Sequence, residues 1–167
     1  DGYDIVDNFL SNNPYIVGKI EAASASPFTG NLIKKYFTIQ RVYNPQKGKS
    51  ENKITAFDCP AWVLMELLSF GDFIHFYEYY YGLKGSIPVD ISMINLVKSL
   101  RNGCAHNNCI IADLNPGSST APAAIYRIIK KMPDINKNQR QKKLSCRAVL
   151  EFVSMLCVYE MVVAEKV

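Results

Sequence analysis

The chain has 167 residues, of which 49% are hydrophobic, and this length and composition suit one folded domain with a substantial core. They exclude a disordered chain. Because the sequence shows neither 18 uninterrupted apolar residues nor a secretion signal, we expect a cytoplasmic protein without a membrane partner. The five cysteines are scattered and odd in number, so we expect reduced thiols instead of a disulfide framework.

The net charge of +4 is unevenly distributed along the chain. Residues 121–147 carry eight Lys and Arg side chains against Asp134 alone, a net +7, which leaves −3 on the remaining residues. This asymmetry indicates a polyanionic partner. An alternative interpretation is a solvated face beside a loop.

Short helices are predicted at the start of the chain. The first has apolar residues at helical spacing, namely Ile5, Val6, Phe9 and Leu10. A break follows at about residues 12–14, and a further helical segment starts near Gly30 with Leu32, Ile33, Tyr36 and Phe37. The run YFTIQRVY at 36–43 is the one β-prone stretch, and NPQKGKSENK at 44–53 is predicted to be a polar loop.

One mostly buried central helix is predicted from Pro60 to Gly82, because the stretch PAWVLMELLSFGDFIHFYEYYYG is apolar on nearly every side. Asp58 and Pro60 are start signals and Gly82 is a stop signal. Gly71 lowers helix stability in the middle of this stretch, so it predicts a kink or a close contact between helices.

Three further helices are predicted in the second half. Asp90 can cap a helix with Ile91, Ile94, Val97 and Leu100 facing inward, and this helix runs into LRNGCAHNN at 100–108. After the loop DLNPGSSTAP, a short basic helix is predicted at about 122–131, followed by a break at 133–138. The chain closes with one amphipathic helix of about seven turns. Its predicted apolar stripe consists of Leu144, Ala148, Phe152, Met155, Leu156, Tyr159, Val162 and Val163. The predicted fold class is therefore all-α, a bundle of four to six helices.

The segment LRNGCAHNN brings Arg101, Asn102 and His106 together at the end of a predicted helix. On an ideal helix Arg101 and His106 lie about 140° apart and about 7.5 Å along the axis, which a long Arg side chain can cover. Asn102 and His106 are i,i+4 neighbours, so Asn102 could orient the imidazole. This set suits RNA cleavage without a metal, because a His can transfer a proton while an Arg binds two phosphate oxygens and neutralises the phosphorane charge.

The chain resembles the Abi-like (abortive infection, AbiD/AbiF type) phage-resistance proteins, which carry a HEPN ribonuclease domain. LRNGCAHNN is similar to the Arg-Asn-x-x-x-His signature of HEPN ribonucleases. The upstream helix is similar to the family's W…E…SFG block, with matching residues Trp62, Glu66, Ser69, Phe70 and Gly71. Relatives usually carry more helical sequence before this block, so we expect a single helical domain over residues 1–167 that is shortened at its N-terminus.

The resemblance implies a HEPN-like bundle and a homodimer in which two copies of the motif line one cleft. It implies a metal-independent endoribonuclease of a phage-defence or toxin-type system, with 2′,3′-cyclic phosphate and 5′-hydroxyl products and no cofactor. Arg101 would hold the scissile phosphate, His106 would transfer the proton and Asn102 would orient one of them. An antitoxin or a regulatory protein would be a further partner. The predicted RNA-binding residues lie in the basic segment and are Arg127, Lys130, Lys131, Arg140, Lys143 and Arg147.

Other interpretations remain open at this stage. His106 and Asn102 could be ordinary residues of a helix end, and Cys104, His106 and Cys109 could suggest zinc, although no second pair of ligands accompanies them. His75 is interpreted as structural, and the aromatic run FYEYYY as packing in preference to RNA stacking. The alternative functions are a non-catalytic HEPN module that binds RNA or a protein, and a structural helical dimer. Nucleotide hydrolysis and proteolysis lack a motif.

Overall fold

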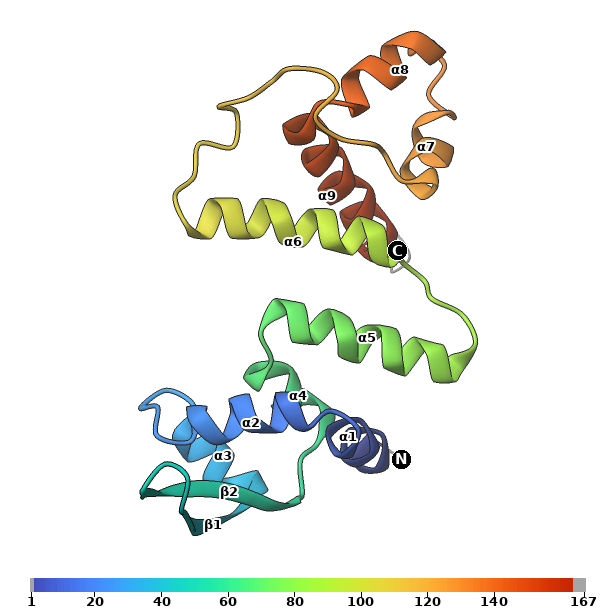
Figure 1. Ribbon diagram of the computed structural model, residues 1–167. Helices are drawn as coiled ribbons and strands as arrows, with labels where there is room; N and C mark the ends of the chain where they lie inside the picture. The colour runs from blue at the N-terminus through green and yellow to red at the C-terminus, as the bar shows by residue number, and fades with distance from the viewer. Residues whose placement is uncertain (1, 164–167) are drawn as a thin grey trace. The chain divides into compact units, whose positions relative to one another are not determined.

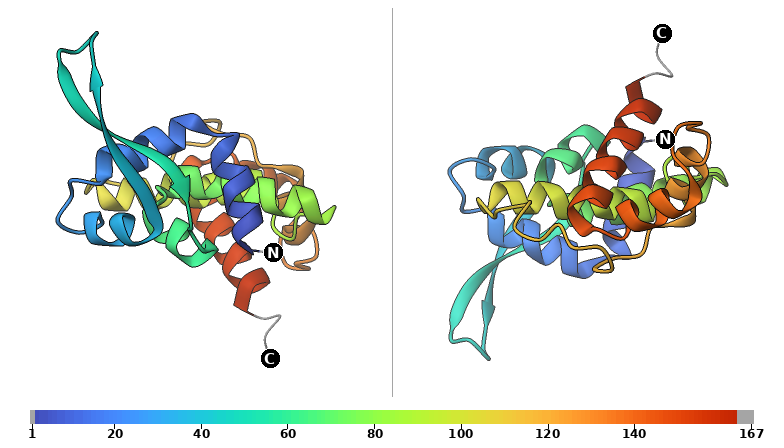
Figure 2. Two further views of the ribbon diagram at one scale, coloured as in Figure 1. Left: turned by 90° about the horizontal axis from the view of Figure 1, so that it is seen from below. Right: turned by 90° about the horizontal axis from the view of Figure 1, so that it is seen from above.

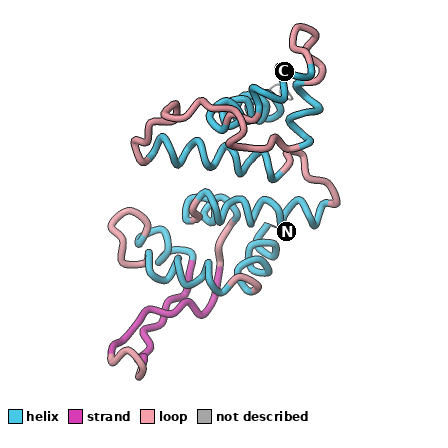
Figure 3. The backbone as a smooth tube through the Cα atoms, turned by 45° about the horizontal axis from the view of Figure 1, so that its top comes forward, coloured by secondary structure: helices cyan, strands magenta, loops and turns pink. Residues whose placement is uncertain are grey.

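The computed structural model describes residues 2–163, which group into two compact units, one ending at Tyr80 and the other beginning at Tyr81. The described residues are mainly helical and include one two-stranded antiparallel sheet (Figures 1 and 3). The expectation of an all-α fold is therefore corrected to a mainly helical fold with a β-hairpin. Within residues 2–163, no helix combines the length and the apolar character needed to cross a membrane.

The first unit is built from short helices around an apolar core. Its elements are α1 (Gly2–Ser11), α2 (Pro14–Ala23), α3 (Gly30–Tyr36), β1 (Phe37–Asn44), β2 (Lys49–Phe57), α4 (Ala61–Leu67) and most of α5 (Phe70–Lys84). The core contains Val6, Phe9, Leu10, Ile16, Ile20, Ile33, Phe37, Cys59, Val63, Leu64 and Phe76. The predicted first helix, the break after it and the helix from Gly30 are confirmed, because their apolar spacing places one face in this core.

The hairpin of β1 and β2 extends beyond the helices of the first unit (Figure 2). Phe37 pairs with Phe57 at its base and Asn44 pairs with Lys49 at its tip, with a register irregularity between Thr38 and Ile39. The β-prone run at 36–43 largely coincides with β1, although the all-α expectation included no strand there, and the predicted loop at 44–53 is wrong from Lys49 onward. Residues 49–53 are polar and carry no strand signal, so their conformation comes from pairing with β1.

The predicted central helix is interrupted, and it forms α4 and α5 as separate helices. Leu68 is extended, with φ −75° and ψ 139°, so the break lies before Gly71. The hydroxyl of Ser69 then accepts a hydrogen bond from the backbone N–H of Asp72 (3.2 Å), which satisfies a donor at the start of α5. The predicted stop at Gly82 is also wrong, because α5 continues to Lys84 and the left-handed residue that follows is Gly85, with φ +76°.

The second unit contains α6 (Ile91–Ala105), α7 (Ala123–Ile129), α8 (Lys137–Leu144) and α9 (Arg147–Val163). Helices α6 and α9 pack against each other, and α7 and α8 pack against α9 (Figure 1). The predicted cap of α6 is confirmed, because the Asp90 carboxylate accepts a hydrogen bond from Ser92 N–H (2.9 Å). The predicted single closing helix is wrong, because the chain breaks at Ser145 and forms α8 and α9.

The outward face of α9 is strongly apolar, which reverses part of the predicted stripe. Leu144 and Ala148 are buried as expected, but five of the six later members of the stripe are exposed and Met155 is half-buried. These exposed residues are Phe152 (43%), Leu156 (60%), Tyr159 (65%), Val162 (53%) and Val163 (43%). The buried face of α9 includes Glu151 and Ser154, and these polar groups are satisfied by Arg147 and by the Leu150 carbonyl, respectively.

Candidate functional site

The Arg101–His106 motif lies at the C-terminal end of α6, and hydrogen bonds define where this helix stops. His106 is the C-cap residue, and Asn107 after it has φ +54°, the only positive φ among the described non-glycine residues. The N–H of Asn107 donates to the Cys104 carbonyl (3.2 Å) and that of Asn108 donates to the Gly103 carbonyl (2.9 Å). This is the Schellman termination, so a defined helix end, not a long loop, carries the motif.

Arg101 and Asn102 interact directly at this helix end. The Nη1 atom of Arg101 donates a hydrogen bond to the Oδ1 atom of Asn102 (3.1 Å). Arg101 and His106 are exposed to solvent and Asn102 is half-buried. The Asn102 carbonyl accepts from the His106 backbone N–H (3.0 Å), while no hydrogen bond to the His106 imidazole is found among the described residues. In one copy of the chain, Asn102 therefore holds Arg101 and leaves the imidazole available.

The cysteines near the motif are free thiols. Cys104 and Cys109 are exposed, whereas Cys59, Cys146 and Cys157 are buried. Burial raises the pKa of the Cys59 thiol to about 12, so this thiol stays protonated at neutral pH. No group of three or more His, Cys, Asp and Glu side chains in residues 2–163 is arranged to hold a metal ion.

The predicted RNA-binding residues differ in how firmly the structure holds them. Arg127, Lys130, Lys131 and Lys143 are exposed on α7, after α7 and on α8. Arg140 is half-buried, its Nη1 donates to the Ile135 carbonyl and its Nε is buried without a partner in the described part of the chain. The exposed lysine side chains can adjust their positions to a polyanion, whereas the Arg140 side chain is held in place by its hydrogen bond to Ile135.

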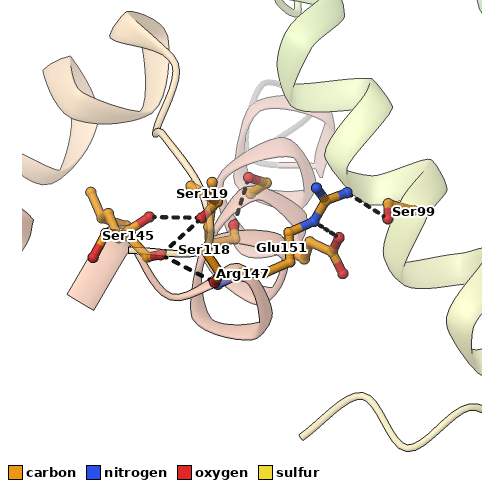
Figure 4. A network of polar contacts seen from close by, with 9 residues as sticks. Ser99, Ser118, Ser119, Ser145, Arg147 and Glu151 are labelled. Atoms are coloured by element: carbon orange, nitrogen blue, oxygen red, sulfur yellow. Dashed lines mark hydrogen bonds and ion pairs between the residues drawn. The ribbon is translucent and has the colours of Figure 1, made fainter. Parts of the chain in front are cut away.

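Arg147 is the centre of a polar network that sequence reasoning did not foresee (Figure 4). Its Nε lies 2.5 Å from Oε1 of Glu151, and its Nη2 donates to the hydroxyl of Ser99 on α6 (3.0 Å). Its backbone N–H donates to the Ser118 hydroxyl (3.1 Å), and Ser119 N–H donates to the Ser145 carbonyl (3.0 Å). The i,i+4 spacing of Arg147 and Glu151 is a weak signal for their pairing, but no sequence signal links Arg147 to Ser99.

Two residues of the second family-like block, Ser69 and Trp62, make defined contacts in the first unit. Ser69 donates a hydrogen bond to the Asp72 carboxylate (2.5 Å), and Lys19 on α2 forms an ion pair with the same carboxylate (2.8 Å). Burial raises the pKa of Asp72, but the hydrogen bonds from Lys19 and Ser69 outweigh it and hold that pKa below its ordinary value. Trp62 is half-exposed and makes an edge contact with Tyr36, with ring centroids 5.7 Å apart.

The aromatic run on α5 contributes to packing in the first unit. Phe76 is buried and meets Phe9 edge-on with ring centroids 5.0 Å apart, and Tyr79 lies 5.3 Å from the same ring. The interpretation of these two rings as packing residues is confirmed. His75 on the same helix is exposed.

Comparison with known families identifies a model described as Abi-like protein, which matches residues 2–112. Because the match covers more than half of the chain, the protein belongs to the Abi-like family, and this membership suggests abortive infection, a form of phage defence. Arg101, Asn102 and His106 lie inside the matched region, whereas the basic residues from Arg127 to Arg147 lie beyond it. Comparisons with curated proteins and with solved structures find no match.

Proposed function

We propose that the protein is a metal-independent endoribonuclease of an abortive-infection system in the cytoplasm, acting through a HEPN-type site. The observation that carries the proposal is the end of α6, where Asn102 holds the Arg101 guanidinium one turn from the exposed His106. All three residues lie within the region that matches the Abi-like family. An arginine and an exposed histidine at the same helix end are groups that can neutralise the phosphorane charge and transfer a proton.

The proposed reaction uses the RNA 2′-hydroxyl as nucleophile. The 2′-oxygen bonds to phosphorus as its proton leaves to a base, and the bond from phosphorus to the 5′-oxygen breaks as that oxygen takes a proton from an acid. The products are a 2′,3′-cyclic phosphate and a 5′-hydroxyl. Arg101 binds the phosphate oxygens, His106 transfers a proton, and Asn102 keeps the guanidinium in position.

One copy of the motif contains one histidine, so we propose that two copies pair and that their two His106 side chains act as acid and base. The outward face of α9 supports pairing. Its five exposed apolar side chains from Phe152 to Val163 present on the order of 500 Å² of surface, a large share of the roughly 800 Å² that each partner buries in a standard interface. The most direct occupant of this face is the same face of a second copy.

The basic residues of α7, of the turn after it, of α8 and of the start of α9 are proposed to guide RNA toward the site. They are Arg127, Lys130, Lys131, Arg140, Lys143 and Arg147. With the opposite charge of the RNA backbone, they would give an affinity that falls as the salt concentration rises. An antitoxin or regulatory protein would have to block the same α6 end or this basic segment.

The test is cleavage of a labelled single-stranded RNA in EDTA by the unmodified protein, His106→Ala and His75→Ala. The chain has two histidines, so His75, which is exposed and outside the motif, is a matched control. We expect cyclic-phosphate ends from the unmodified protein and His75→Ala, and a rate reduced about 10²- to 10⁴-fold in His106→Ala. Equal cleavage by His106→Ala would contradict the proposal.

A second candidate is a non-catalytic HEPN module that binds RNA or a protein partner. It is favoured by the His106 imidazole, which no other group of the described chain orients. This candidate predicts salt-dependent RNA affinity without cleavage by any version of the protein. It also predicts that His106→Ala binds RNA as the unmodified protein does.

A further inference from the structure

We propose that Arg147 forms a second phosphate-binding position, which holds a neighbouring phosphate of the RNA strand whose scissile phosphate is bound by Arg101. This inference rests on the proposed ribonuclease function and specifies how the strand is aligned. It separates Arg147 from the other cations of the basic segment, because Arg147 alone among the six predicted RNA-binding residues donates a hydrogen bond to α6 in the described chain.

The guanidinium of Arg147 is held on one side and open on the other. Glu151 accepts from Nε (2.5 Å) and Ser99 accepts from Nη2 (3.0 Å). The Glu151 side chain is 9% exposed, whereas that of Arg147 is 53% exposed. A guanidinium has five N–H donors, so both hydrogens of Nη1 and the second hydrogen of Nη2 remain without a partner in residues 2–163. These terminal N–H groups form the fork that binds two phosphate oxygens.

The contact with Ser99 places this fork beside the helix face that carries Asn102 and His106. On α6, Ser99 and His106 lie about 20° apart around the axis and about 10.5 Å along it, with Asn102 between them. The face that Arg147 contacts therefore continues toward the C-cap to Asn102 and His106. Arg101 itself lies about 160° from Ser99 around the axis, but its guanidinium reaches Asn102 Oδ1 (3.1 Å), at the edge of this face. A short stretch of single-stranded backbone along this face would therefore meet His106 and the guanidinium of Arg101 at one end and Arg147 at the other.

The surrounding network fixes Arg147 before any ligand binds (Figure 4). The loop that follows the motif is fastened to the start of α9, because Gly117 N–H donates to the Ser145 carbonyl (3.1 Å) and the Ser118 hydroxyl accepts from Arg147 N–H (3.1 Å). An arginine side chain held by the Glu151 carboxylate and the Ser99 hydroxyl loses less side-chain freedom on binding than a free lysine. This preorganisation is the property that an alignment site needs and that a general electrostatic surface does not.

The test pairs changes in the protein with changes in the RNA. After the cut site in a single-stranded RNA is mapped, each of the two linkages beside it is replaced in turn by an uncharged methylphosphonate. We expect one replacement to lower kcat/KM of the unmodified protein by about 10- to 100-fold, the range for a hydrogen bond to a charged group. The same replacement should hardly change the kcat/KM of Arg147→Gln, because this variant already lacks the interaction between Arg147 and the neighbouring phosphate.

Lys142→Gln is the matched control, since Lys142 is exposed on α8 and the change removes the same charge. In this variant the methylphosphonate should act as it does in the unmodified protein. Independent, multiplicative effects of Arg147→Gln and the methylphosphonate would overturn the proposal, because they would mean that Arg147 only joins α6 to α9. The absence of any effect at both linkages in the unmodified protein would also overturn it, without the need for a variant.

Arg147→Gln leaves the buried Glu151 without its cation, so the double variant Arg147→Gln/Glu151→Gln is tested beside it. If the unmodified protein does not cleave RNA, the RNA affinity of each protein variant is measured for the unmodified RNA and for the methylphosphonate RNA. Loss of Arg147 should then reduce the slope of log affinity against log salt by about one. Coupled affinity without cleavage would remove the ribonuclease proposal alone. Cleavage without coupling would remove the role of Arg147 alone.

Discussion

Replacing Asp72 by alanine should destabilise the first unit substantially. The buried carboxylate accepts hydrogen bonds from Lys19 Nζ (2.8 Å) and Ser69 Oγ (2.5 Å), and Ser69 in turn caps the backbone N–H at this position. A hydrogen bond to a charged group contributes about 1.5–3 kcal/mol, and the contact with the half-exposed Lys19 is discounted because solvent screens it. We expect a loss of about 2–3 kcal/mol in the free energy of unfolding, or roughly 4–12 °C in Tm.

The assay is urea unfolding followed by the fluorescence of Trp62, the single tryptophan, which lies on α4 in the first unit. Glu66→Ala removes an exposed carboxylate from the same helix and should change the free energy by less than about 0.5 kcal/mol. Because the folded pKa of Asp72 is lowered, its contribution is complete above the unfolded pKa and is lost as the pH falls through the folded value. An Asp72→Ala effect no larger than that of Glu66→Ala, or a difference from the unmodified protein that does not shrink below about pH 4, would refute this reasoning.

Three further outcomes are expected. Leu156→Asp places a charge in the outward face of α9 and should shift the mass measured by light scattering from dimer to monomer without loss of helical circular dichroism; a monomeric unmodified protein would contradict the pairing proposal. Asn107→Gly should preserve stability, whereas Asn107→Val should lower it by about 1–2 kcal/mol, because φ +54° is unfavourable for a β-branched residue, and equal unfolding midpoints would exclude that strain. Iodoacetamide at pH 8 should label Cys104 and Cys109 in the native protein and spare Cys59, whose pKa of about 12 keeps it protonated, and rapid labelling of Cys59 seen by mass spectrometry would contradict its burial.

Local features of the fold could be predicted from sequence. The helix at Ile5 to Leu10 and the Asp90 cap depend on spacings of a few residues, and each is present in the structure. The break between α4 and α5 shows the limit of this approach. An apolar stretch predicts burial but not continuity, and the side-chain bonds of Ser69 and Asp72 that start a new helix compete with continuing the old one.

Long-range features could not be predicted in the same way. β2 begins with the polar residues Lys49 to Lys53, which become a strand because β1 supplies the partner. The outward orientation of Leu156 and Tyr159 also contradicts the simple rule that the apolar face of a helix points inward. The inward face of α9 is instead partly polar, and its buried Glu151 is satisfied by Arg147, which also bonds to Ser99 on α6. For the candidate site, the sequence indicates Arg101, Asn102 and His106, but the contact between Ser99 and Arg147 joins residues 48 positions apart.

If two His106 side chains share one reaction, an inactive copy should suppress an active one. We expect a tenfold excess of His106→Ala, after exchange of subunits, to leave only about one in eleven unmodified copies in fully active dimers, so that activity per unmodified copy falls about tenfold. The matched control is the same excess of His106→Ala combined with Leu156→Asp, which cannot pair and should leave activity unchanged. Because both mixtures contain the same competing RNA-binding surface, a difference between them isolates pairing. Equal activity in the two mixtures would show that each copy cleaves RNA alone, and the single imidazole of one copy would then have to serve with water as its counterpart.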